Sequence, residues 1–206
     1  MNINEIRIYR ECKEGFLKGF VNITLNHAIS IKGIKIIETE EKRFVSMPSK
    51  VFKGDLMNIA FPINQNVRNE LEDLILGLYD DMVNDNLMYI EKEYYSDNSL
   101  YINDIKVDNH EFQNSVKAVF DIVVNKEYVL KGIKLLYKND HYFIVMPNHF
   151  VKNQFIDYYH PINSPIRQKL EELLIGIYTK SKEGMTHFKN YTQKDIMKTS
   201  LLDFVY

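Results

Sequence analysis

The sequence repeats itself after about 99 residues, without a gap, from about residue 3 to residue 79 of the first copy. Pro62-Ile63-Asn64 recurs as Pro161-Ile162-Asn163, and about 23 positions are identical between the two copies. A gapless repeat of this length predicts one structural unit built twice. We expect a first repeat unit at residues 1–82, an acidic linker at 83–99, a second repeat unit at 100–182 and a C-terminal tail at 183–206.

Within each repeat, the hydrophobic pattern predicts strands first and one helix last. Residues 16–25 and 29–37 are rich in β-branched and aromatic side chains, and Asn26-His27 between them is typical of a tight hairpin turn. A third strand is expected to end at Met47-Pro48, because proline cannot donate a hydrogen bond to a strand pair. Lys53-Gly54-Asp55 then predicts the tip of a loop or of a short hairpin.

After the strands, the hydrophobic period changes to that of a helix, starting from Val67 in the first repeat and from Ile166 in the second. In the second repeat, Ser164 followed by Pro165 predicts a helix start with the serine as its N-cap. Gly77 and Gly176 lie at equivalent helical positions, where we expect a close backbone approach, because glycine otherwise weakens a helix.

The order of these elements predicts an α+β fold class. We expect two tandem copies of a small antiparallel β-sheet unit with a C-terminal helix on one face, packed as an intramolecular pseudo-dimer. No helices alternate with the strands, which disfavours a doubly wound parallel sheet.

The composition restricts the class of protein rather than its activity. The chain of 206 residues has 26 Lys and Arg against 28 Asp and Glu, so neither sign of charge is in large excess. The near-neutral total is the sum of an acidic first half and a basic second half. It is therefore compatible with a local basic surface that binds a ligand. The single cysteine excludes an internal disulfide, and no stretch is long and apolar enough to span a membrane. We expect a cytoplasmic globular protein without membrane association.

Two motifs of the first repeat resemble the family of stage V sporulation protein G, the septation protein family. Met47-Pro48-Ser49-Lys50 is followed, at matching spacing, by Ile59-Ala60-Phe61-Pro62-Ile63-Asn64. The second repeat is a looser match, with Met146-Pro147-Asn148-His149 in the first place and His160-Pro161-Ile162-Asn163 in the second. The family usually carries the histidine that the second repeat keeps and the first replaces with phenylalanine.

This resemblance implies a non-enzymatic regulator of septation and sporulation that binds DNA or RNA as a homodimer. A chain with two copies then resembles that dimer joined covalently, so that pairing becomes intramolecular. We expect a monomeric pseudo-dimer, with a higher oligomer as the open alternative, and neither a cofactor nor a catalytic residue. The alternative function is a protein-interaction or structural module that keeps the fold without binding nucleic acid.

The candidate nucleic-acid-binding residues lie in the loop after each Met-Pro and at each helix start. Basic side chains there can neutralise phosphates, and a helix N-terminus itself favours a phosphate. The candidates are Lys50, Lys53, Arg68, His149, Lys152, Arg167 and Lys169. For Lys53 and Lys152 the alternative is a solvated surface charge. For Arg68 and Arg167 it is a structural bond to a loop carbonyl or to the glutamate four residues on.

The remaining polar residues do not predict catalysis or metal binding. His141, His149 and His160 have neither the short spacing nor the cysteine partners of a zinc site, so we expect ordinary histidines and no metal. Cys12 lies in a charged stretch that does not indicate a nucleophile, and the chain has no glycine-rich phosphate loop.

Overall fold

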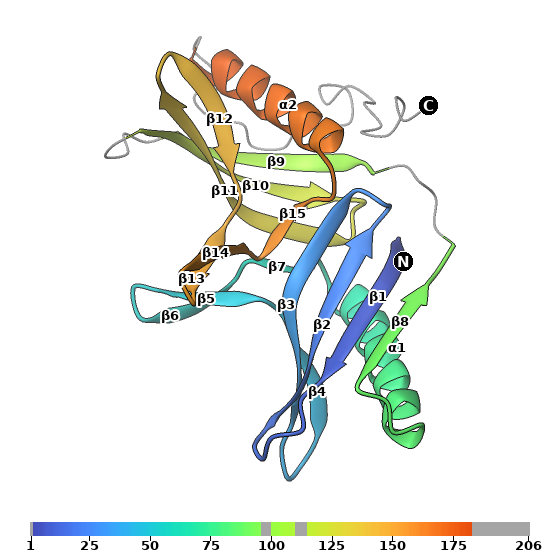
Figure 1. Cartoon of the computed structure of the whole chain (residues 1–206). Helices are drawn as coiled ribbons and strands as arrows, with labels where there is room; N and C mark the ends of the chain where they lie inside the picture. Colours follow the sequence, from blue (N-terminus) through green and yellow to red (C-terminus); the bar gives the residue numbers. More distant parts are fainter. Residues whose placement is uncertain (1, 96–99, 110–114, 183–206) are drawn as a thin grey trace.

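Two antiparallel sheets, each with one long helix, make up the protein (Figure 1). The structure is a computed structural model and describes residues 2–95, 100–109 and 115–182. The first part of the chain forms β1 (Ile3–Arg10), β2 (Leu17–Leu25), β3 (Ile29–Glu38), β4 (Arg43–Ser46), β5 (Ser49–Phe52), β6 (Asp55–Asn58), β7 (Ala60–Pro62), α1 (Gln65–Asn84) and β8 (Tyr89–Glu93). The second part forms β9 (Ile102–Asp108), β10 (Val116–Val124), β11 (Tyr128–Lys138), β12 (His141–Val145), β13 (Asn148–Val151), β14 (Gln154–Asp157), β15 (Tyr159–Pro161) and α2 (Ser164–Lys182).

The predicted hairpin turns are confirmed in both repeats. Asn26 and His27 have φ angles of 47° and 50°, and Asn125 and Lys126 have 54° and 57°. Two successive positive φ angles define a type I′ turn, whose twist matches that of the flanking strands. The turn therefore fixes the register of β2 on β3 and of β10 on β11.

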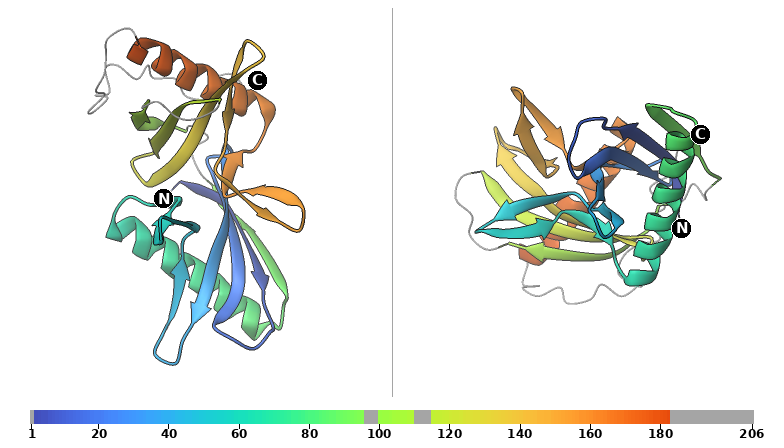
Figure 2. Two further views of the ribbon diagram at one scale, coloured as in Figure 1. Left: turned by 90° about the vertical axis from the view of Figure 1, so that its left-hand side faces the viewer. Right: turned by 90° about the horizontal axis from the view of Figure 1, so that it is seen from below.

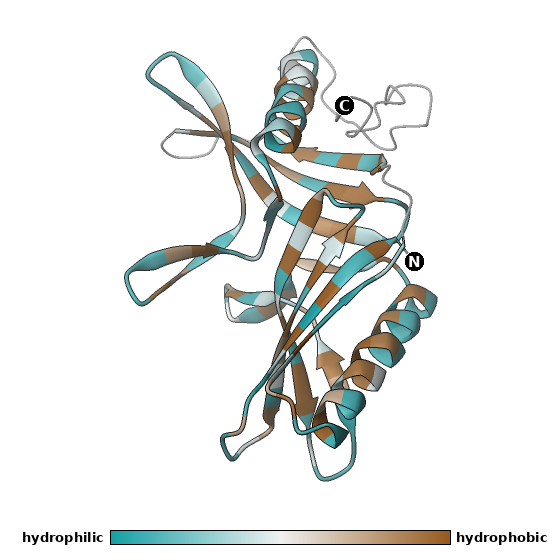
Figure 3. Cartoon of the chain, turned by 45° about the vertical axis from the view of Figure 1, so that its right-hand side comes forward, coloured by the Kyte–Doolittle hydropathy of each residue, from teal (hydrophilic) through white to brown (hydrophobic). Residues whose placement is uncertain are grey.

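Each helix covers one face of its own sheet and leaves the other face open. In the first repeat the helix packs against the sheet through Leu71, Ile75, Tyr79 and Met82. Ile6 and Ile8 are buried, whereas Arg7 between them is half-buried and points to the opposite face. Hydrophobic and hydrophilic residues alternate along the strands of both sheets (Figure 3). This α+β arrangement agrees with the fold class expected from the hydrophobic pattern.

The two repeats are joined by a reciprocal exchange of short strands. β15 of the second repeat pairs with β3 of the first, and β7 of the first repeat pairs with β11 of the second. Equivalent bonds extend each pairing. The Lys32 N–H donates to the Tyr158 carbonyl at 2.8 Å, and the Lys131 N–H donates to the Ile59 carbonyl at 2.8 Å. Each sheet is therefore completed by a strand from the other repeat.

Asn26 and Asn125 mark the axis that relates the two repeats. They are equivalent residues, 99 positions apart, and the side-chain amide of Asn125 donates a hydrogen bond to the side-chain oxygen of Asn26. Two equivalent residues that contact each other lie on the two-fold axis of a symmetric pair. The two hairpin turns thus meet at the axis between the repeats.

The segment between the repeats is partly structured. Helix α1 continues to Asn84, and β8 pairs antiparallel with β1, so that Ile90 lies opposite Ile8. Part of the segment expected as an acidic linker is therefore the edge strand of the first sheet. The expected tail at 183–206 lies outside the described residues.

Two local expectations for the helices are wrong. The N-cap of the second helix is Asn163 rather than Ser164, because the Asn163 side-chain oxygen accepts a bond from the Ile166 N–H at 3.0 Å. The equivalent Asn64 accepts from the Val67 N–H at the same distance. Gly77 and Gly176 make no close backbone approach: a methyl group added at either would meet nothing within 4 Å.

Replacing these two glycines with alanine is expected to stabilise the protein. Gly77→Ala and Gly176→Ala should each raise the free energy of unfolding by about 0.5–1 kcal/mol, because alanine loses less backbone entropy in a helix. Urea unfolding measures the change. Gly33→Ala is the control, and it should lower stability because Gly33 has a φ of 76°. Destabilisation by both helical substitutions would contradict the open space around the two glycines.

The exchanged strand is fastened by a buried tyrosine hydroxyl. Tyr159 is buried, and its hydroxyl donates to the Lys131 carbonyl at 3.0 Å. Tyr128 is equally buried, but its hydroxyl has no hydrogen-bond partner among the described residues. Tyr159→Phe should therefore cost about 0.5–1.5 kcal/mol, whereas the matched Tyr128→Phe should be neutral or stabilising. Equal losses in the two variants, measured by urea unfolding, would contradict the assigned bond.

Candidate nucleic-acid interface

Two short hairpins project to the same side of the molecule in Figure 1 and in the right-hand view of Figure 2. They are β5–β6 and β13–β14, each a separate two-stranded sheet. Lys53 and Gly54 turn the first hairpin with φ angles of 52° and 92°, and Lys152 and Asn153 turn the second with 47° and 64°. The turn therefore places an exposed lysine at each tip.

The first hairpin and the sheet of the second repeat enclose a cavity of about 570 Å³. Lys50, Phe52 and Met57 line it from the hairpin. Lys106, Lys131 and Lys134 line it from strands β9 and β11. We call it the lysine cavity, after these four lysines. It exists only where the two repeats meet, so neither repeat could form it alone.

The strand register explains why the lysines of the second repeat converge. Asp121 lies directly opposite Lys106 on one side and Lys131 on the other. Lys134 lies in the next row, opposite Val119. Residues directly opposite each other in antiparallel strands share a face, and here it is the face that α2 does not cover. The sheet therefore presents these cations together.

The lysine cavity has an excess of positive charge. None of its four lysines forms an ion pair with any of the described residues. The two aspartates of the cavity are Asp108 and Asp121, and Asp121 accepts a hydrogen bond from the Gly132 N–H at 3.0 Å. Four cations against two carboxylates favour an anionic ligand.

Aromatic rings lie beside the cations. The Lys131 ammonium sits 5.2 Å from the centre of the Phe61 ring, and the Lys53 ammonium 5.5 Å from that of Phe52. Such contacts hold a flexible lysine in place while its charge stays available. An aromatic ring next to a cation is an arrangement that can accept a base and its phosphate.

The equivalent face of the first repeat is more nearly neutral. Arg7, the counterpart of Lys106, forms ion pairs with Glu5 at 2.6 Å and with Glu91 at 3.1 Å. Glu91 belongs to β8, which pairs with β1 at the edge of the first sheet. The two halves of the molecule therefore offer different surfaces to a ligand although their folds match.

Arg68 and Arg167 brace the fold from the two helices. The Arg68 guanidinium donates to the Val45 carbonyl at 2.8 Å, and that of Arg167 donates to the Ile144 carbonyl at 2.7 Å. In each repeat, the glutamate four residues on accepts a bond from the N–H of the same strand residue. This geometry favours the structural alternative for both arginines, and neither lines the lysine cavity.

The other predicted residues are spread over two elements. His149 lies in β13 with its ring against that of Tyr158, the centres 4.7 Å apart. Lys152 is exposed at the tip of the same hairpin, and Lys169 is half-buried on α2. The structure thus groups Lys50 with Lys53 and His149 with Lys152, and it keeps Lys169 apart from both groups.

Three lysines of the cavity were not predicted from the sequence motifs: Lys106, Lys131 and Lys134. A signal for them exists in the repeat. Their counterparts 99 residues earlier are Arg7, Lys32 and Lys35, so all three positions are basic in both copies. Basic residues that alternate with buried ones along a strand mark one open face of a sheet.

The relatives of this chain agree with the repeated fold. The model of the SpoVG family matches twice, at residues 1–81 and 100–180. The chain belongs to the SpoVG family. It is 39% identical over 83 residues to the SpoVG septation protein of Alkaliphilus oremlandii, which covers 40% of this chain and 89% of the relative.

Two further septation proteins named SpoVG show the same proportions. That of Lachnoclostridium phytofermentans is 40% identical over 81 residues, covering 39% of this chain and 87% of the relative. That of Staphylococcus aureus is 35% identical over 83 residues, covering 40% and 83%. These relatives correspond to about one repeat, whereas this chain carries two SpoVG units in tandem.

Two negative observations apply to the described residues alone. Residues 2–95, 100–109 and 115–182 contain no group of histidine, cysteine and carboxylate side chains arranged to hold a metal ion. Within the same ranges, neither helix is apolar enough over a sufficient length to cross a bilayer.

Replacing Arg68 tests its assigned role. Arg68→Gln should lower the free energy of unfolding by about 1–2 kcal/mol, because it removes a charge-assisted bond to a strand carbonyl. Lys53→Gln, at an exposed turn, is the control and should leave stability unchanged. Urea unfolding of both variants measures these free energies. An unchanged stability for Arg68→Gln would contradict the structural role.

Proposed function

We propose that this SpoVG-family chain is a non-enzymatic regulator that binds nucleic acid, DNA or RNA, through the lysine cavity and the two hairpins. The observation that carries the proposal is the convergence of four lysines from both repeats in one cavity, without carboxylate partners among the described residues. A phosphate backbone is the polyanion that such a surface recognises, since each neutralised phosphate releases a counterion.

The hairpin residues extend the proposed contact beyond the cavity. Lys53 is exposed at the tip of the first hairpin, next to Phe52, a residue that is 52% exposed. A base can stack on such a ring while its phosphate reaches the lysine. His149 and Lys152 would make the corresponding, weaker contact from the second hairpin.

The covalent link between the repeats has a consequence for binding. The lysine cavity requires a hairpin from one repeat and a sheet from the other. In a single-copy relative, the equivalent surface would depend on association of two chains. Here pairing is intramolecular, so the proposed site should persist at any dilution.

The decisive variant is the double substitution Lys50→Gln with Lys131→Gln. We expect its affinity for labelled single-stranded DNA and RNA to fall by about tenfold, and the salt dependence to weaken by about 1.5 in the log–log slope. Fluorescence anisotropy at several salt concentrations measures both quantities. Lys180→Gln, an exposed lysine on the helix-covered side of the sheet, is the matched control.

Two results would contradict the proposal. One is the absence of binding to either nucleic acid at about 50 mM salt, where electrostatic attraction is strong. The other is an affinity that the double substitution lowers no more than Lys180→Gln does.

A protein-interaction module is the second candidate, and the outward faces of the hairpins favour it. Val51 and Leu56 lie opposite each other in the first hairpin and are 70% and 71% exposed. Phe150 and Phe155 occupy the equivalent positions in the second, and are 60% and 74% exposed. Exposed apolar pairs at equivalent positions of both repeats are typical of a contact surface. This function would leave nucleic-acid affinity undetectable, whereas the first candidate requires it.

A further inference from the structure

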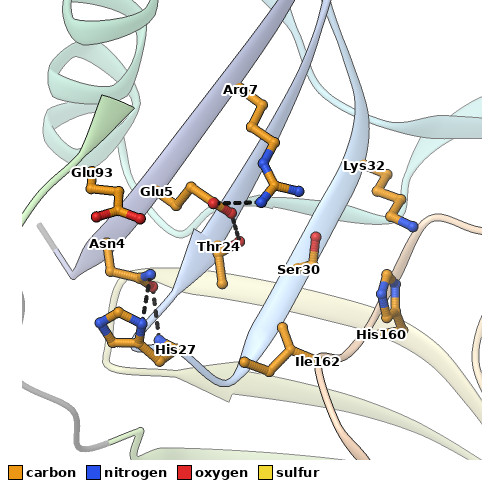
Figure 4. Close-up of a pocket in the computed structure, with 10 residues that line it drawn as sticks. All are labelled: Asn4, Glu5, Arg7, Thr24, His27, Ser30, Lys32, Glu93, His160 and Ile162. Carbon is orange, nitrogen blue, oxygen red and sulfur yellow. Dashed lines mark hydrogen bonds and ion pairs between the residues drawn. The ribbon is translucent and has the colours of Figure 1, made fainter. Parts of the chain in front are cut away.

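A second cavity, of about 390 Å³, lies where the exchanged strand β15 meets β3 (Figure 4). His160 and Ile162 line it from the second repeat, and residues of β1, β2, β3 and β8 line it from the first. We call it the histidine cavity. Like the lysine cavity, it owes its existence to the strand exchange, but its polar residues are different.

Three hydrogen-bond donors converge on one side of this cavity. His160 lies directly opposite Ser30 in the pairing of β15 with β3, so their side chains share a face. Lys32 lies two residues beyond Ser30 on the same strand, which brings it to the same face. Figure 4 shows the Lys32 ammonium next to the His160 ring, with the Ser30 side chain on the same strand as Lys32.

None of these three donors forms a side-chain hydrogen bond or an ion pair among the described residues, although the Asp157 carboxylate is near enough to attract Lys32 and His160. Apart from Glu93, the other polar side chains of the cavity are paired. Asn4 bonds to the ring and the N–H of His27 at 3.0 and 2.7 Å. Glu5 accepts from Arg7 at 2.6 Å and from Thr24 at 3.0 Å. Ser30, Lys32 and His160 therefore differ from the neighbouring polar side chains, most of which are hydrogen-bonded within the protein.

The charges around the three donors favour an anion. Burial lowers the pKa of His160, the Lys32 ammonium and Arg167 lower it further, and Asp157 opposes them. An anion bound here would offset the two nearby cations and so favour protonation of the ring. Of the two carboxylates in the cavity, Glu5 is held by Arg7, and Glu93 lies at the far end from Lys32 (Figure 4).

The equivalent site, where β7 of the first repeat meets β11 of the second, lacks this arrangement. The counterparts of Ser30, Lys32 and His160 are Val129, Lys131 and Phe61, so only the lysine is kept. There the lysine packs over the phenylalanine ring. The chain therefore contains a natural comparison, in which the same backbone carries one donor instead of three.

We propose that the histidine cavity is a binding site for a phosphate monoester, with the phosphate group held by Ser30, Lys32 and His160. A tetrahedral phosphate offers several acceptor oxygens to donors that arrive from two strands, and Lys32 supplies the opposite charge. Pockets of about 300–1,000 Å³ hold whole small molecules, so the rest of the cavity suits a small organic group with hydroxyls facing Asn4 and Glu93. Nucleoside monophosphates and sugar phosphates belong to this class.

The test is an NMR titration of the folded full-length chain, which contains six histidines. Inorganic phosphate and a nucleoside 5′-monophosphate are titrated separately up to about 10 mM, a range that detects millimolar affinity. We expect a saturable shift of the His160 ring resonance. Tighter binding of the nucleotide would identify the esterified ligand, and equal binding would identify the free phosphate ion as sufficient.

The second repeat supplies the decisive variant and its control. Ser30→Val with His160→Phe installs Val129 and Phe61, the side chains of the equivalent site where β7 meets β11, a combination that the same backbone already accommodates there. It should weaken binding, followed by calorimetry, by at least about tenfold. Lys131→Gln changes the equivalent lysine of the other half, and should leave phosphate affinity unchanged even though it weakens nucleic-acid binding. The two proposals can therefore fail independently.

Sulfate, which remains a dianion, tests the role of the histidine. Its affinity should rise as the pH falls below about 6.5, because the lowered pKa of His160 places its protonation there, and His160→Phe should abolish that dependence. The site is overturned if no saturable shift occurs at His160, or if the double variant binds phosphate as well as the unmodified chain.

Discussion

The exchange of two three-residue strands is the contact on which the rest of the structure depends. β7 and β15 each leave their own repeat and complete the sheet of the other. β15 and β4 pair with successive parts of the same edge of β3, and β7 and β12 do the same on β11. Both long strands are therefore paired along most of this edge. Unpaired edge strands are prone to aggregation, and the exchange covers them. A unit of about 80 residues also buries only a small hydrophobic core, which the contact between the two repeats enlarges. The lysine cavity lies beside β11 and the histidine cavity beside β3, the two strands that receive the exchanged strands.

The internal duplication allows the two halves to differ while the fold stays the same. A homodimer of single units must place identical side chains in both of its equivalent sites. Here Phe61 and His160 occupy equivalent positions with different chemistry, and Arg7 is neutralised by β8 where Lys106 is not. The structure thus combines a symmetric backbone, with Asn26 and Asn125 on its axis, and two unlike surfaces. We infer that one surface serves a phosphate backbone and the other a small phosphorylated molecule.

Sequence patterns predict the local structure of each repeat, whereas the strand exchange depends on contacts between the repeats. Hairpins and helices depend on short-range signals, such as Asn26-His27 or the apolar stripe of α1, and these were predicted correctly. β7 and β15 are too short to show a hydrophobic period, so their exchange left no local signal. The helix cap was misassigned because both Asn163 and Ser164 are good caps, and only the observed bond to the Ile166 N–H separates them. Lys50 was a candidate from its motif, whereas Lys106 and Lys134 reach the same cavity only through the packing of the two repeats.

Cooperative unfolding tests the strand exchange most directly. If each sheet needs a strand from the other repeat, neither repeat can unfold alone without exposing the partner's edge and its buried Tyr128 or Tyr159. Urea unfolding followed by NMR resonances assigned to each repeat should then give one midpoint for both, independent of protein concentration. Two separate midpoints, or a midpoint that rises with concentration, would show that the repeats are independent units or that they exchange strands between chains.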